Sequence, residues 1–193
     1  MDQLGDSGDS RAKIESGKDA GSRNSGAISA TEDAARRRFA AANDALGIAF
    51  AYLNKRERTE AAIRARLEGA GCAPGEIDDA IDELRALGQV DDARFARLFA
   101  QDRRELDGWG RDRIARRLHE LGVERELIGE VLGAEPEKEL ERAVELLGRR
   151  FPAGPGDVGD ARLRERAMGV LIRKGYDSEV ASDAVSRWTD RSP

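Results

Sequence analysis

The sequence has one cysteine, one histidine and few aromatic residues, which make up 5% of the chain. One cysteine excludes a disulfide framework within the chain, and one cysteine with one histidine cannot form a Cys/His zinc site. The phosphate-binding, dinucleotide-binding, serine-hydrolase and zinc-protease motifs are also absent. The sequence therefore predicts no cofactor, no metal, no small-molecule substrate and no enzymatic activity.

Long hydrophobic runs and an excess of positive charge are missing as well. The longest apolar run, at residues 46–53, is far shorter than a membrane span, and the first thirty residues contain no apolar segment typical of a secretory signal. The formal net charge is −5, so overall charge does not indicate a nucleic-acid binder. These features predict a cytoplasmic protein that does not bind membranes.

A repeated pattern is the main positive signal: an apolar residue, leucine four positions later, and glycine four positions after that. The copies are Ile63…Leu67…Gly71, Ile114…Leu118…Gly122 and Ala167…Leu171…Gly175. Residues four apart share one face of a helix, and glycine commonly ends a helix. Two further residue types recur every 47 residues, namely Ala49, Ala96 and Ala143, and Arg56, Arg103 and Arg150. A repeated helical unit without a catalytic constellation predicts an extended binding surface.

The repeat and the apolar periodicity predict an all-α fold, with three tandem three-helix repeats that form an elongated, curved helical array. We expect the repeats at residues 44–90, 91–134 and 135–193. Residues 1–43 are predicted to be a disordered tail, because their Gly-, Ser- and Asp-rich composition buries too little apolar surface. Each repeat is small, so neighbouring repeats are expected to share apolar surface.

Two helical segments are locally basic in this acidic chain. Residues 103–117 carry six arginines against three acids, and residues 162–174 carry five basic residues against one acid. The residues expected to contact a partner, either a protein or DNA, are Arg103, Arg104, Arg111, Arg113, Arg116, Arg117, Arg164, Arg166, Arg173 and Lys174. Ordinary solvated helix faces with ion pairs four residues apart would give the same composition. Trp109 fits packing at a repeat junction better than stacking on a base.

Three segments carry a resemblance to a known family. These are residues 87–96 (LGQVDDARFA), residues 108–122 with their Gly…Ile…Leu…Gly-Val spacing, and Leu53-Asn54-Lys55-Arg56 followed by Ile63 and Leu67. Together they resemble the RecX family, the regulators of the RecA recombinase, over roughly residues 44–190. The resemblance implies a non-enzymatic protein that binds RecA nucleoprotein filaments in their groove and limits strand exchange, ATP hydrolysis and stimulated repressor cleavage. Some members of the family also bind DNA.

Two other functions remain open on the sequence. The chain could bind single- or double-stranded DNA directly through its two arginine-rich helices, or it could be a helical-repeat adaptor with an unrelated partner. Salt-dependent binding of naked single-stranded DNA would favour the first of these, whereas selective binding to RecA-coated DNA would favour the RecA regulator.

Overall fold

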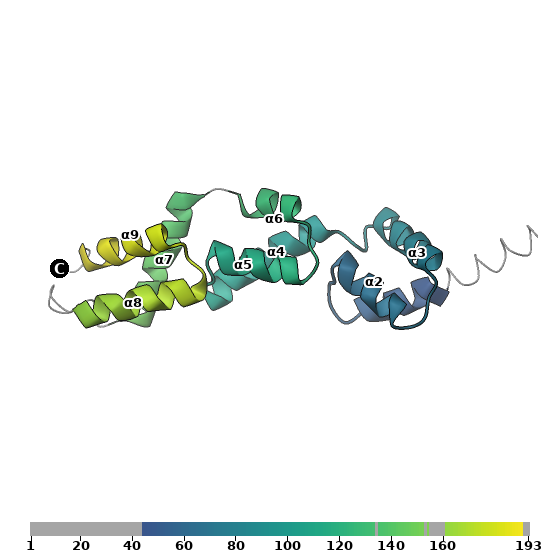
Figure 1. Ribbon diagram of the computed structural model, residues 1–193, viewed down its shortest axis with the longest axis horizontal. Coiled ribbons are helices and arrows are strands. Elements are labelled where there is room, and N and C mark those ends of the chain that lie inside the picture. The colour runs from purple at the N-terminus through teal and green to yellow at the C-terminus, as the bar shows by residue number, and fades with distance from the viewer. Residues whose placement is uncertain (1–43, 134, 153, 155–160, 191–193) are drawn as a thin grey trace, which may run out of the picture. The chain divides into compact units, whose positions relative to one another are not determined.

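The computed structural model describes residues 44–133, 135–152, 154 and 161–190, and within these ranges it contains helices and no strand. The all-α prediction is confirmed, while the predicted disordered tail lies outside the described residues. The helices comprise residues 44–53, α2 (Glu60–Glu68), α3 (Pro74–Ala86), α4 (Asp92–Asp107), α5 (Arg111–Glu120), α6 (Arg125–Leu132), α7 (Pro136–Arg150), α8 (Ala161–Lys174) and α9 (Ser178–Asp190) (Figure 1).

Buried apolar side chains form three separate clusters. The first contains residues between Ala45 and Val90, the second between Ala96 and Leu132, and the third between Leu140 and Trp188. Each cluster draws its residues from one of the repeats proposed above. Among the described residues, no cluster of buried residues spans two repeats, and the expectation that neighbouring repeats share apolar surface stays a prediction.

The leucine of each repeated pattern belongs to the buried cluster of its repeat. Leu67, Leu118 and Leu171 are fully buried, and so are the apolar residues four positions before them. The pattern also explains where the helices end, because the residue after each glycine donates its N–H to the carbonyl of that leucine. This turn places Gly71, Gly122 and Gly175 at φ values of +83°, +85° and +87°, as expected for glycines that close a helix in the left-handed conformation.

Candidate partner-binding surface and repeat junctions

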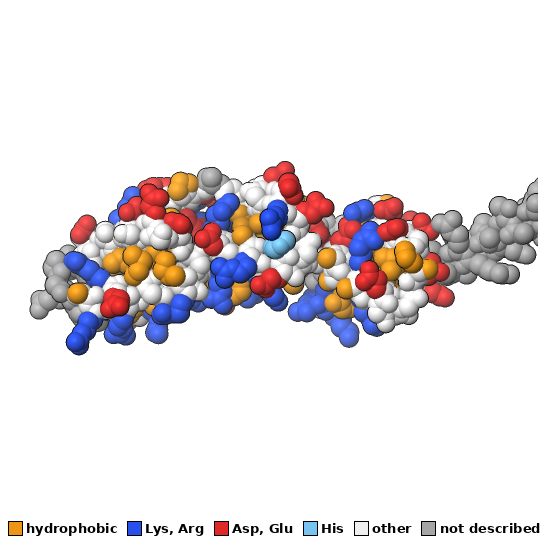
Figure 2. Space-filling model, in the orientation of Figure 1, with side chains coloured by type: hydrophobic (Ala, Val, Ile, Leu, Met, Phe, Trp, Pro, Cys, Tyr) orange, Lys and Arg blue, Asp and Glu red, His pale blue; other side chains and the backbone are white. Residues whose placement is uncertain are grey.

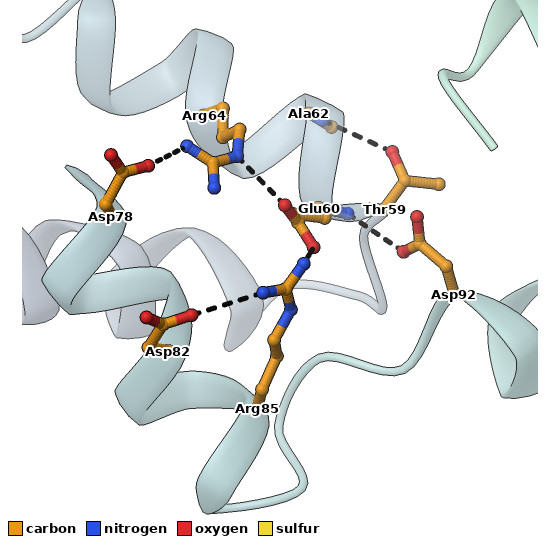
Figure 3. Close-up of polar contacts among 8 residues, drawn as sticks. All are labelled: Thr59, Glu60, Ala62, Arg64, Asp78, Asp82, Arg85 and Asp92. Carbon is orange, nitrogen blue, oxygen red and sulfur yellow. Dashed lines mark hydrogen bonds and ion pairs between the residues drawn. The ribbon is translucent and has the colours of Figure 1, made fainter. Parts of the chain in front are cut away.

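Two consecutive acids at the start of α4 connect the first repeat to the second. Asp91 caps its own helix by accepting the Arg94 N–H at 2.8 Å. The Asp92 carboxylate reaches α2 instead and accepts the Glu60 N–H at 2.9 Å (Figure 3). Asp92 is half-buried, and this burial raises the pKa of its carboxyl group, although the hydrogen bond from Glu60 opposes the rise. One acid therefore caps its own helix while the other caps a helix of the preceding repeat.

Glu60 also joins α2 to α3 through its carboxylate. It pairs with Arg64 at 2.9 Å and with Arg85 at 2.5 Å. Arg64 and Arg85 each have a second acidic partner on α3, Asp78 and Asp82 respectively (Figure 3). Two hydrogen bonds raise the pKa of Arg64. The bond to Asp78 contributes most, and the bond to Glu60 contributes next. This network lines a surface hollow of about 560 Å³ between repeats 1 and 2, and both of the arginines that line it are already paired.

The contact between the second and third repeats reproduces this arrangement. Glu139 of α7 accepts the Arg111 N–H, in the first turn of α5, at 2.7 Å. Positions 92 and 139 are 47 residues apart, the same period as the alanines and arginines of the sequence. Glu139 is buried and also pairs with Arg142 at 2.8 Å. Each junction therefore uses an acid from the first helix of one repeat to cap the second helix of the repeat before it.

The second helices of the three repeats also meet end to end, in the order α8, α5, α2 (Figure 1). At the start of α5, the Gly110 N–H donates to the Lys174 carbonyl at 2.8 Å and the Asp112 N–H donates to the Gly175 carbonyl at 3.1 Å. At the start of α2, the Thr59 hydroxyl donates to the Leu121 carbonyl at 2.7 Å. The last carbonyls of one helix thus receive donors from the first turn of the next.

Glycine is required where these helices touch. A Cβ on Gly110 would overlap the backbone of Gly175, and a Cβ on Gly175 would overlap Arg113. At the other junction, a Cβ on Gly122 would overlap the Cβ of Ala61. No heavy atom lies within 4 Å of the corresponding Cβ position on Gly71, at the end of α2. Gly122 and Gly175 therefore serve the junctions as well as their own turns.

Several of the predicted partner-binding residues take part in the junction between repeats 2 and 3. The Arg113 guanidinium donates to the Arg173 carbonyl at 3.0 Å and lies 4.2 Å from the centre of the Trp109 ring. The Lys174 ammonium donates to the Asp107 carbonyl at 2.6 Å, and Arg111 Nε donates to the Gly133 carbonyl at 3.1 Å. The side chains of Arg113 and Lys174 therefore join repeats 2 and 3. The Arg111 side chain bonds within repeat 2, and only its backbone N–H reaches repeat 3.

Arg103 and Arg104 are also only partly exposed. Arg103 pairs with Asp107 and lies 5.4 Å from the Phe99 ring centre and 5.7 Å from that of Trp109. Arg104 is half-buried, and burial together with the nearby charge of Arg142 lowers the pKa of its guanidinium. Trp109 belongs to the second apolar cluster as a partly buried side chain, so it packs within repeat 2.

The remaining predicted residues are exposed. They are Arg116 and Arg117 on α5 and Arg164, Arg166 and Arg173 on α8. Arg117 pairs with Glu120 at 2.8 Å, whereas Arg116 forms no ion pair within the described part of the chain. Figure 2 shows basic side chains gathered along α8 and around α5. The structure does not test whether any of these residues binds a partner.

Asp92 and Glu139 were not among the residues selected from the sequence. Acids at helix starts usually cap their own helix, so the presence of an acid there does not indicate a contact with another repeat. The 47-residue spacing between Asp92 and Glu139 was the one sequence feature that could have identified them, because it equals the spacing of the repeated alanines and arginines. Across the described ranges, no group of three or more His, Cys, Asp or Glu side chains is arranged to hold a metal, and no helix there is long and apolar enough to cross a membrane.

Two family models and several curated proteins that match this chain carry the same family name. A family model described as the first three-helix domain of RecX matches residues 45–84, and one described as the second three-helix domain matches residues 91–132. The protein "Regulatory protein RecX" of Mycobacterium avium (strain 104) is 35% identical over 135 residues, which cover 69% of this chain and 78% of that protein. The protein of the same name from Trichlorobacter lovleyi is 33% identical, with 68% and 87% covered.

Solved structures show the same fold. The crystal structure of RecX from Lactobacillus salivarius superposes with a TM-score of 0.67 at 17% identity and covers 78% of this chain and 97% of its own. A second crystal structure, of regulatory protein RecX, superposes with a TM-score of 0.63 at 24% identity, with 79% and 75% covered.

Proposed function

Because the chain belongs to the RecX family, we propose that it is a regulator that binds the RecA nucleoprotein filament and inhibits its recombinase, ATPase and coprotease activities. The observation that carries the proposal is the identity of 35% to a protein named "Regulatory protein RecX" across 69% of this chain. Such a regulator acts in the cytoplasm, in DNA recombination, DNA repair and the SOS response. It acts by binding, without catalysis of its own.

The two junctions suit a ligand built from identical subunits. Hydrogen bonds accepted by the carboxylates of Asp92 and Glu139 fix each repeat against the preceding one, so contact residues on successive repeats keep a constant separation. A filament presents the same surface at regular intervals. Linked weak contacts to several subunits raise the overall affinity by about 10²–10⁴ without any new kind of contact.

Among the predicted partner-binding residues, we assign the first RecA contacts to Arg116 and Arg117 of α5. Both guanidinium groups are exposed, and neither contributes to a junction. Arg117 is paired with Glu120 in an exposed i,i+3 pair, which is weak enough to exchange for a partner's carboxylate. Arg164 on α8 is exposed too and remains a further candidate.

The test measures ATP hydrolysis by RecA on single-stranded DNA at increasing concentrations of the regulator. Arg116→Glu/Arg117→Glu should require at least about tenfold more protein for equal inhibition, because each lost charge-assisted hydrogen bond contributes about 1.5–3 kcal/mol. The matched control is Arg66→Glu/Arg97→Glu, which reverses two exposed arginines on α2 and α4. Circular dichroism and melting should be the same for all three proteins.

Two outcomes would contradict the proposal. Equal inhibition by the parent and by Arg116→Glu/Arg117→Glu would show that these arginines do not contact RecA. Absence of inhibition by the folded parent, together with equal binding to naked and RecA-coated DNA, would instead support a direct nucleic-acid-binding protein.

A further inference from the structure

A second surface hollow, of about 460 Å³, lies where repeats 2 and 3 meet. Its lining residues come from α4, α5 and α6 of repeat 2 and from α7 and α9 of repeat 3. They include three arginines, four acids and the apolar side chains of Leu132, Pro136 and Val180. We call it the Arg104 hollow, after the arginine that α4 contributes to it.

Arg104 differs from the other two arginines of this hollow in lacking a partner. Arg142 pairs with Glu139, and Arg111 donates to the Gly133 carbonyl. Arg104 forms no ion pair or hydrogen bond with another residue in the described part of the chain. Its Nε is buried without a hydrogen-bond partner, so its surroundings supply no acceptor and its terminal nitrogens remain available on the hollow side.

The unpaired charge of Arg104 is unfavourable for folding. The guanidinium is half-buried, and this burial, together with the charge of Arg142, lowers its pKa. The charges of Glu139 and Glu135 oppose the shift, but neither carboxylate pairs with Arg104. A partly buried charge without a counter-charge loses hydration and gains no interaction in return. A residue that opposes folding in this way is typical of a binding site.

The acids that line the hollow limit which anion can enter. Asp112, Glu135 and Asp177 are exposed residues among its lining, so a nucleic-acid strand or a phosphate dianion would meet several negative charges. A carboxylate brings one negative charge, and its two oxygens match the two-pronged guanidinium of Arg104. The apolar lining, including the buried Leu132, favours a carboxylate carried between apolar groups over a free hydrated ion.

We propose that the Arg104 hollow binds the carboxylate of an aspartate or glutamate side chain on a partner protein, where apolar neighbours of that acid cover Leu132 and Val180. The inference deepens the proposed function and rests on it for the identity of the partner, which is then RecA. Because both repeats line the hollow, an acid bound there also contacts repeat 2 and repeat 3 at once.

Thermal melts of three variants test whether Arg104 is held without a partner. Arg104→Met keeps an apolar stem and removes the charge, so the melting temperature should rise by about 2–4 °C. Arg142→Met leaves the buried Glu139 unpaired, so it should lower the melting temperature instead. Arg97→Met, which changes an exposed arginine on the same helix, is the matched control and should shift it by less than about 2 °C. A lower melting temperature for Arg104→Met overturns the proposal.

Two peptides and inorganic phosphate test the ligand on the full chain. Acetyl-Leu-Glu-Leu-amide at millimolar concentration should raise the melting temperature of the parent and of Arg97→Met by roughly 2–4 °C, and should leave that of Arg104→Met unchanged. Acetyl-Leu-Gln-Leu-amide, which lacks the carboxylate, should change none of them. Equal shifts with the two peptides, no shift with either, or a larger shift with inorganic phosphate overturns the proposal.

Inhibition of RecA on single-stranded DNA tests the source of the carboxylate separately. Arg104→Met should need at least about tenfold more protein than the parent or Arg97→Met for equal inhibition of ATP hydrolysis, since charge-assisted hydrogen bonds are lost. If the glutamate peptide binds while Arg104→Met inhibits as well as the parent, the assignment to RecA is overturned and the carboxylate site stands. If the folded parent does not inhibit RecA, the proposed function fails, and the peptide melts still decide the site.

Discussion

Replacing Gly122 by alanine should lower the free energy of unfolding through two separable effects. Gly122 has a φ of +85°, where alanine is disfavoured by about 1–2 kcal/mol. In addition, the new Cβ would overlap the Cβ of Ala61 on α2, and relieving such an overlap takes about 1–3 kcal/mol. Gly122→Ala should therefore lower the free energy of unfolding by about 2–5 kcal/mol.

The chain supplies its own control for the first effect. Gly71 has nearly the same φ, +83°, but no heavy atom lies within 4 Å of its Cβ position. Gly71→Ala should therefore lower the free energy of unfolding by about 1–2 kcal/mol only. The difference between the two variants measures the contact between α5 and α2, because the backbone penalty is common to both.

A double-mutant cycle tests the same contact from the other side. Ala61→Gly alone should cost about 0.5–1 kcal/mol, because glycine is a poor helix former. In the Gly122→Ala/Ala61→Gly protein the overlap disappears, so the loss should be smaller than the sum of the two single losses. Urea unfolding followed by circular dichroism measures all four proteins. Equal losses for Gly71→Ala and Gly122→Ala, or strict additivity in the cycle, would refute the end-to-end contact between these helices.

Two further predictions concern the junction of repeats 2 and 3 and the core of repeat 3. Arg113→Ala should destabilise the protein by roughly 1–2 kcal/mol, since it removes a hydrogen bond to the Arg173 carbonyl and the contact with Trp109; Arg116→Ala should change stability by less than about 0.5 kcal/mol in the same thermal melts. Burial raises the pKa of Tyr176 to about 12 from its ordinary value of 10.0, so the unfolded chain ionises first and stability should fall by about 2–3 kcal/mol as the pH rises between these two values. In urea unfolding at a series of pH values, Tyr176→Phe should abolish that part of the decline, and an unchanged decline would contradict the assignment.

Much of the fold was predictable because it depends on local spacing. Apolar residues four apart report one face of a helix, and the glycine that follows reports its end, so Leu118 and Gly122 could be assigned before the structure. Apolar periodicity carries no information on polar contacts between repeats. Asp92 and the residue that donates to it, Glu60, are 32 residues apart, and nothing local distinguishes Asp92 from an acid that caps its own helix.

The same limit applies to the basic residues of the candidate site. Local charge selected Arg113 and Lys174 together with Arg116, because all three belong to arginine-rich segments. The structure separates them, since Arg113 and Lys174 donate to backbone carbonyls of a neighbouring repeat and Arg116 does not. Sequence composition shows how many basic side chains a helix carries. Whether each one bonds within the protein or stays exposed depends on which other helix packs against that helix.

The two junctions also bear on how such a chain can lengthen by gene duplication. A repeat is compatible with the one before it if its first helix carries an acid at the position of Asp92 and Glu139 and its second helix ends in glycine. The second and third repeats satisfy both conditions, so each carries what these junctions require of the repeat that follows. The first repeat has Ala45 at the equivalent position, 47 residues before Asp92, where it is fully buried. It can therefore begin a series of repeats but lacks the acid needed to follow another one.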